Sequence, residues 1–166
     1  AQLAMPLSLE VTPELTLFAG GQSRSVQAYR PDEGRLEAVV GWYPQRVATG
    51  SLARFRDESF GSVGGLVYDR AAGKISLSET SAHRLHVVHV ANPADEGSWE
   101  IEVLAGGEEG ALDGPLANAR FREPGGLFLD EARSVLYVAD TGNHAIRAID
   151  LSAGLDTADV STVAGT

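Results

Sequence analysis

Three histidines recur at intervals of three residues, at His83, His86 and His89. Imidazole nitrogens are frequent metal ligands, and on a helix this spacing would bring all three rings to one side. On a β-strand, side chains alternate between the two faces, so His83 and His89 share a face and His86 points away from them. A metal site also needs further ligands, which one strand does not supply. We therefore predict no metal site and no cofactor at this run.

A second polar group consists of Asp140, Asn143 and His144, and the pair Glu79 and His83 repeats part of it. We predict a structural role for these residues, in which Asp140 accepts hydrogen bonds from the backbone of a tight turn. Asn143 and His144 would then satisfy the carbonyl groups of the same turn. Glu79 and His83 would do this at an earlier point of the chain.

No pattern in the sequence identifies a catalytic residue. There is no G-x-S-x-G nucleophile elbow, and no glycine-rich phosphate loop with a lysine. The glycine pairs along the chain are expected to serve turns and the beginnings of strands. We therefore assign no catalytic residue.

Two loops offer side chains for binding. A tryptophan and a tyrosine stand next to each other, and such a pair can stack on a sugar, anchor a partner or fill a gap between structural units. A longer loop is expected at residues 57–63, where an insertion either marks a binding face or simply reflects tolerated drift. The candidate binding residues are Trp42, Tyr43, Asp57, Glu58 and Phe60.

Composition limits the class of partner. The 166 residues carry a net charge of −10, and a surface that binds nucleic acid needs clustered Lys and Arg instead. The absence of cysteine excludes disulfides and thiolate metal sites. No apolar stretch is long enough for a membrane-spanning helix, so we expect a soluble protein. The compartment stays open, with secretion and the periplasm among the options, and a start at Ala1 suggests a removed leader or a piece of a longer polypeptide.

The elements that must position these residues recur along the chain. Alignment of Gly126 with Gly65 gives an offset of 126 − 65 = 61, and His144 then falls on His83 with the same offset. A chain built from copies of one unit is a repeat protein, and most of its recurring residues build the repeat.

A second offset reveals a third copy. Residues 127–130 align with 7–10 at an offset of 127 − 7 = 120, and this register continues without a gap to residues 135–138 against 15–18. In this first copy, Gly20 and Arg24 stand where the third copy has its aspartate and histidine.

The third copy resembles the NHL repeat, the Asn-His-Leu family of β-propeller blades. The resemblance covers nearly the whole chain and is densest in its last third. The matching residues are Asp113, Gly114, Pro115, Ala119, Phe121, Pro124, Gly126, Leu136, Tyr137, Val138, Ala139, Asp140, Thr141, Asn143, His144, Ile146, Arg147 and the closing segment Val160–Gly165.

Each copy is predicted to form four short strands. In the third copy these lie at roughly 126–130, 135–140, 145–151 and 160–164. A turn joins the second and third of these strands, and Gly142 and Asn143 are the residues there that can adopt positive φ. The segment 135–139 is apolar on both faces, which is typical of blades that stack face to face. No helix is predicted.

The predicted fold is all-β: one propeller segment over residues 1–166, with four-stranded antiparallel blades at about 5–41, 53–106 and 119–165. Propellers have about four to eight blades, and the resemblance implies six. The segment is therefore an incomplete propeller with two open apolar faces. We expect completion by a second chain, a homodimer included, or by further blades from sequence beyond this segment.

Two functions from different classes fit this fold. The favoured hypothesis is a scaffold for binding or assembly, with a protein, a peptide or a glycan as ligand and no enzymatic activity. The alternative is a contribution to a metal-assisted lyase or hydrolase with its active site at the propeller axis. The metal content of the purified assembly would separate the two.

Overall fold

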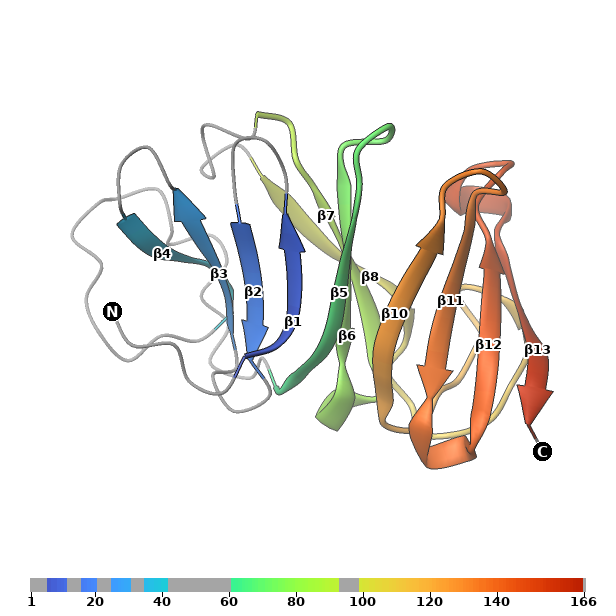
Figure 1. Cartoon of the computed structure of the whole chain (residues 1–166). Helices are drawn as coiled ribbons and strands as arrows, with labels where there is room; N and C mark the ends of the chain where they lie inside the picture. The colour runs from blue at the N-terminus through green and yellow to red at the C-terminus, as the bar shows by residue number, and fades with distance from the viewer. Residues whose placement is uncertain are drawn as a thin grey trace.

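In the computed structural model, the described residues are 6–11, 16–20, 25–30, 35–41, 61–92 and 99–165. They form three antiparallel sheets that stand side by side (Figure 1). The first sheet contains β1 (Pro6–Val11), β2 (Thr16–Gly20), β3 (Ser25–Arg30) and β4 (Arg35–Gly41). The second contains β5 (Val63–Asp69), β6 (Lys74–Glu79), β7 (Arg84–His89) and β8 (Glu100–Gly106). The third contains β10 (Pro124–Asp130), β11 (Val135–Asp140), β12 (Ala145–Asp150) and β13 (Asp159–Gly165), with the short β9 (Gly114–Pro115).

Each sheet is a meander in which consecutive strands are hydrogen-bonded neighbours, and β9 adds to the outer edge of β13. The pattern of the sequence explains the strands. Along β11, residues 136, 138 and 140 are buried while the residues between them are partly exposed, which is the period of two that a strand requires. The preceding polar turn closes through Ser134, whose φ of 55° is left-handed.

The sheets pack through their first strands, with β5 between β1 and β10. The approach of β5 to β10 is close. A Cβ on Gly65 would lie 2.9 Å from the carbonyl oxygen of Gly125 and 2.9 Å from the amide nitrogen of Leu127, so only glycine fits at position 65. Two apolar cores result, one between the first and second sheets and one between the second and third.

The register of the first sheet differs from the sequence prediction. Pro6 pairs with Gly20 as Pro124 pairs with Asp140, so β1 aligns with β10 at an offset of 124 − 6 = 118, whereas 140 − 20 = 120 holds for the second strands. Leu9, not Leu7, therefore occupies the position of Leu127. A shift of two residues leaves every side chain on its original face, so apolar spacing does not reveal it.

Short 3₁₀ turns, η2 (Thr80–Ala82) and η4 (Thr141–Asn143), join the second and third strands of the second and third sheets. A further 3₁₀ turn, η5 (Leu155–Thr157), precedes β13. Gly142 and Asn143, the turn residues that can adopt positive φ, do not adopt it; the left-handed residues are those that follow the turns, His83 with φ 55° and His144 with φ 53°. A 3₁₀ turn that ends in a left-handed residue reverses the chain there. No helix in the described part of the chain is long and apolar enough to cross a membrane.

Candidate functional site

In the third sheet, the polar residues are arranged around a buried carboxylate, Asp140, which accepts several hydrogen bonds. Asp140 lies at the end of β11 and is fully buried. It accepts hydrogen bonds from the backbone N–H of Arg122 at 2.8 Å, from Asn143 Nδ2 at 2.8 Å and from Arg147 Nη1 at 2.8 Å. Asn143 also donates to the carbonyl oxygen of Gly110 at 2.7 Å. The bonds of Asp140 and Asn143 therefore join the turn to the loop before β10, which differs from the predicted bonds within the turn itself.

Arg147 completes this group from β12. Its side chain is 1% exposed, and its guanidinium carbon lies 5.2 Å from the centre of the Phe121 ring. Besides Asp140, it binds Asp113 Oδ1 at 2.5 Å and donates to the carbonyl oxygens of Arg120 and Leu112 at 3.1 Å and 2.8 Å. A planar guanidinium with five N–H donors suits such a buried, many-sided site.

Asp113 anchors the same group to the outer strand. It accepts hydrogen bonds from the backbone N–H of Thr162 at 3.0 Å and from the Thr162 hydroxyl at 3.1 Å. Burial acts to raise the pKa of Asp113, but these bonds and the bond from Arg147 hold its pKa below the ordinary value. The Asp-Gly-Pro segment that sequence analysis assigned to the repeat therefore ties the loop before β10 to β13.

The second sheet contains a matching group with different residue types. Glu79 accepts hydrogen bonds from the backbone N–H of Gly61 at 2.5 Å, from Arg84 Nε at 2.6 Å and from His86 Nε2 at 2.7 Å. Glu79 and His86 stand at the positions of Asp140 and Arg147, since 140 − 79 = 61 and 147 − 86 = 61. Burial acts to raise the pKa of Glu79, but the bonds from His86, Arg84 and Gly61 lower it to about 2.

These two carboxylates are built to hold structure. A general base must be able to reach a substrate proton, and both side chains are fully buried with donors around them. The H-x-x-H-x-x-H run is likewise dispersed: His83 lies in the turn before β7, His86 binds Glu79, and His89 Nε2 lies 2.8 Å from Glu102 Oε1. Within the described residues, no three His, Cys, Asp or Glu side chains come together as a metal site.

Three side chains of the second sheet hold the backbone of the third. The Ser78 hydroxyl donates to the carbonyl oxygen of Gly125 at 2.6 Å, and the Thr80 hydroxyl donates to that of Pro124 at 2.9 Å. The backbone N–H of Glu123 donates to His83 Nδ1 at 3.0 Å. We call Ser78, Thr80 and His83 the backbone latch of the second sheet. It accounts for a histidine in the turn, a role that the sequence did not predict.

The third sheet has an apolar face directed away from the second sheet. Its residues are Phe128 (65% exposed), Tyr137, Ile146 (40% exposed), Ala148 and Val163 (53% exposed). The Phe128 and Tyr137 rings stack with their centres 6.5 Å apart. We call this set the outward face of the third sheet. Among the described residues, no other sheet covers it.

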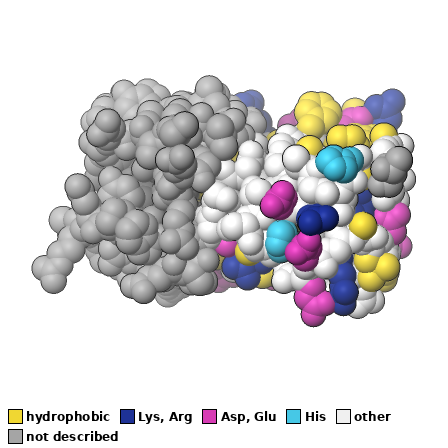
Figure 2. All heavy atoms as spheres, turned by 90° about the horizontal axis from the view of Figure 1, so that it is seen from below, with side chains coloured by type: hydrophobic (Ala, Val, Ile, Leu, Met, Phe, Trp, Pro, Cys, Tyr) yellow, Lys and Arg dark blue, Asp and Glu magenta, His cyan; other side chains and the backbone are white. Residues whose placement is uncertain are grey.

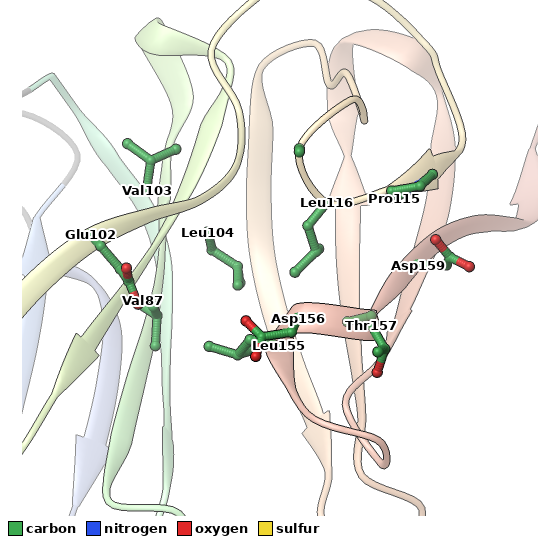
Figure 3. A pocket seen from close by; sticks show the side chains of 12 residues that line it. Val87, Glu102, Val103, Leu104, Pro115, Leu116, Leu155, Asp156, Thr157 and Asp159 are labelled. Carbon is green, nitrogen blue, oxygen red and sulfur yellow. The ribbon is translucent and has the colours of Figure 1, made fainter.

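A groove of about 470 Å³ opens between the outer strands of the second and third sheets. Figure 3 shows Leu104, Leu116 and Leu155 pointing into it, with Glu102 and Asp156 on its two walls. The three leucines belong to the apolar core between the two sheets. The groove is thus the wedge that remains where the outer strands diverge.

The η2 and η4 turns lie at the lower end of Figure 1. Seen from that end, Figure 2 shows imidazole, guanidinium and carboxylate side chains over the second and third sheets. Two glutamates of the loop before β9 form ion pairs, with Arg120 Nη2 2.5 Å from Glu108 and Arg122 Nε 2.8 Å from Glu109. Paired, exposed charges of this kind are typical of a solvated surface.

Several predicted positions lie outside the described residues. The candidate binding residues Trp42, Tyr43, Asp57, Glu58 and Phe60 are all among them. The prediction of a loop over 57–63 needs one correction, because Val63 is the first residue of β5 and is fully buried. Sequence analysis missed two members of the group around Asp140 as partners, Arg147 and Asp113, although both belong to the repeat motif.

Solved structures share this arrangement of sheets. An auxiliary nutrient binding protein from Bacteroides thetaiotaomicron superposes with a TM-score of 0.67 over 95% of this chain and 35% of its own, at 16% identity. The crystal structure of a nidogen/laminin complex matches with a TM-score of 0.63 over 96% of this chain and 48% of its own, at 13% identity. Together with the antiparallel sheets, these likenesses define the class of the protein: an incomplete β-propeller.

Sequence comparison finds NHL-repeat proteins among the relatives of the chain. NHL repeat-containing protein 2 of Bos taurus is 34% identical over 103 residues, 61% of this chain, and the human protein of that name gives the same figures. Protein SUPPRESSOR OF QUENCHING 1, chloroplastic, of Arabidopsis thaliana is 46% identical over 50 residues. The chain spans 12% and 5% of the lengths of these relatives, and no model of a known protein family matches it. These relatives and the solved structures support an NHL-repeat β-propeller family for the chain, the family that its sequence motif resembles.

Proposed function

We propose that this chain is a scaffold for binding and assembly, and that the outward face of the third sheet is its binding surface. One position carries the proposal. Val26, Leu85 and Ile146 are equivalent residues of the three sheets, each at the same pair of the third strand with the fourth. Val26 and Leu85 are covered by the next sheet and are 1% and 0% exposed, whereas Ile146 is 40% exposed.

The other residues of the outward face can be compared with the second sheet in the same way. The second-sheet residues Val67, Val87 and Leu104 pack in the core that the second sheet shares with the third. Their equivalents in the third sheet are Phe128, Ala148 and Val163, since 128 − 67 = 61, 148 − 87 = 61, and 163 − 104 = 59 in the last strands. Aliphatic and aromatic residues are thus present at the positions where the preceding sheet receives its neighbour. They support a further blade as the group that covers this face.

Coverage of the outward face is also favoured energetically. Soluble proteins seldom leave large contiguous apolar patches in water, and such patches mark interaction sites. Burial of apolar surface contributes about 25 cal/mol per Å², so coverage of three exposed large side chains would stabilise an assembly. The further blade can come from a second chain or from sequence beyond this segment. The predicted ligands, a protein, peptide or glycan, would then bind to the assembled propeller.

The test is the self-association of the purified chain, measured by sedimentation equilibrium over a range of concentrations. Phe128→Glu places a charge on the outward face at a side chain that is 65% exposed, so it should leave the fold intact and weaken association by about ten-fold or more. Val103→Glu is the matched control, because Val103 is 50% exposed but lies on β8, outside that face. Equal association of the two variants would contradict the proposal.

A further inference from the structure

We propose that a second copy of this chain occupies the outward face, docked head to tail, with the backbone of its strand β1 held by Gly126, Thr141 and His144. This inference rests on the proposed function and deepens it by naming the partner and the mode of contact. It predicts that the third sheet of one copy meets the first sheet of the next. A face-to-face pairing of two outward faces would make different contacts.

The first observation concerns glycine. Gly65 and Gly126 are equivalent, and Gly65 must be glycine because the backbone of β10 lies against it. A Cβ on Gly126 would have no atom of the described residues within 4 Å, and Gly126 has no left-handed φ that would require glycine. If another strand packed against Gly126 as β10 packs against Gly65, that strand would leave no room for a side chain, which would explain the glycine at position 126.

The second observation concerns the backbone latch. Thr141 and His144 stand at the positions of Thr80 and His83, since 141 − 80 = 61 and 144 − 83 = 61. Both are exposed. Within the described residues, the Thr141 hydroxyl donates to the carbonyl oxygen of Ala139, two residues away, and the His144 ring makes no hydrogen bond to another sheet. The third sheet therefore has the same hydroxyl and imidazole groups as the second sheet, but no described strand lies against them.

The latch also defines what it can hold. At the contact between the second and third sheets, Thr80 binds the carbonyl oxygen of Pro124 and His83 binds the N–H of the preceding residue, both backbone groups. The third member of the latch, Ser78, has Ala139 as its equivalent, so only Thr80 and His83 have counterparts in the third sheet. A backbone latch requires a strand in this register and no particular side chain. β1 supplies such a strand, because its Pro6 takes the register position of Pro124. The first strand of a second copy is thus an occupant that the chain itself provides.

The geometry makes the contact heterologous, since two different surfaces meet. Two copies that each dock on the other would form two identical contacts and close a ring. Where the rotation does not close, the same contact continues into longer chains of copies. In both cases every contact passes through Gly126, Thr141 and His144.

Gly126→Val distinguishes this mode of docking from nonspecific apolar association, because the two predict opposite changes in the strength of self-association. Valine adds apolar surface to the outward face, so nonspecific apolar association would become stronger. Under the proposal the new side chain occupies the space of the incoming strand, and association weakens by about ten-fold or more. Sedimentation equilibrium of the full chain measures this, and circular dichroism verifies the fold, which the open space at Gly126 should preserve.

Ser161→Val is the matched control. Ser161 lies on β13, where it pairs with Ala148, and it is exposed. Valine there adds the same surface away from the proposed β1 contact and should not weaken association. A double variant, Thr141→Val with His144→Phe, removes the latch and should also weaken association.

The outcomes separate this inference from the proposed function. If Phe128→Glu weakens association but Gly126→Val does not, the outward face binds in another mode and the inference is overturned. If neither variant changes association, the proposed function fails with it. Weakening by Phe128→Glu, Gly126→Val and the double variant, with Ser161→Val unaffected, supports head-to-tail docking through β1.

Discussion

The two buried carboxylate groups show how residue types change together while a geometry is kept. The third sheet pairs a short acid with a long base, Asp140 with Arg147, and the second pairs a long acid with a short base, Glu79 with His86. In both, one carboxylate oxygen also receives a backbone N–H from the segment before the sheet. In both sheets the two side chains together span the distance between the two strands, and the hydrogen bond from the backbone N–H is kept.

Glu79 makes stability depend on pH in a defined window. Its folded pKa of about 2 lies below the ordinary 4.5, so its stabilising contribution is fully present above pH 4.5 and is lost as the pH falls towards 2. A tenfold change in a proton-binding constant corresponds to about 1.36 kcal/mol, so the free energy of unfolding should fall by roughly 3 kcal/mol. Urea unfolding between pH 5 and 2 should show this fall in the wild type and a shallower one in Glu79→Gln.

Glu131→Gln, in an exposed turn, is the control and should keep the wild-type dependence on pH. An unchanged slope in Glu79→Gln would show that the bonds from His86 and Arg84 do not favour the charged carboxylate.

At this scale the sequence predicted Asp140 and Glu79 as structural positions but not their partners. An arginine inside an alternating strand reads as an exposed residue, because nothing local shows that Asp113, 34 residues earlier, comes to meet Arg147. The histidines were harder still, since the partner of His83 is the backbone of Glu123, 40 residues away.

At the scale of elements, the strands follow from apolar periodicity, and their registers do not. The strands of the third sheet lie within two residues of the predicted ones, because apolar runs such as residues 135–139 leave little choice. The register of β1 was misplaced by two residues, since a shift of two residues preserves the alternation of apolar positions in the sequence. The left-handed turn residues were also misassigned, because glycine and asparagine are only preferred at such positions, not required.

The core of the third sheet gives a direct test of these assignments. Leu136 is fully buried in the core between the second and third sheets. Leu136→Asp would bury an unpaired charge, which costs several kcal/mol, so the third sheet should unfold. Leu112→Asp, at a side chain that is 47% exposed, should change stability by about 0.5 kcal/mol or less. Loss of β-sheet circular dichroism distinguishes the two, and equal behaviour would contradict the placement of Leu136.

For the whole molecule, repeat counting predicted an incomplete propeller, and the three stacked sheets and the solved propellers confirm that class. Which face stays open, and how the next strand would meet it, could not be read from the sequence. Those features depend on comparing equivalent positions, such as Leu85 with Ile146 and Gly65 with Gly126, in their different surroundings. The interfaces between neighbouring sheets inside the chain therefore serve as references for the interface that the outward face would form.

The central claim is that the outward face of the third sheet receives a further blade, here from a second copy. The most direct measurement is the solution mass of the wild-type chain by light scattering across a range of concentrations. We expect a folded species near twice the 17.5 kDa chain mass, or a larger one that the same contact builds. A folded chain that remains a 17.5 kDa monomer at every concentration would contradict the account.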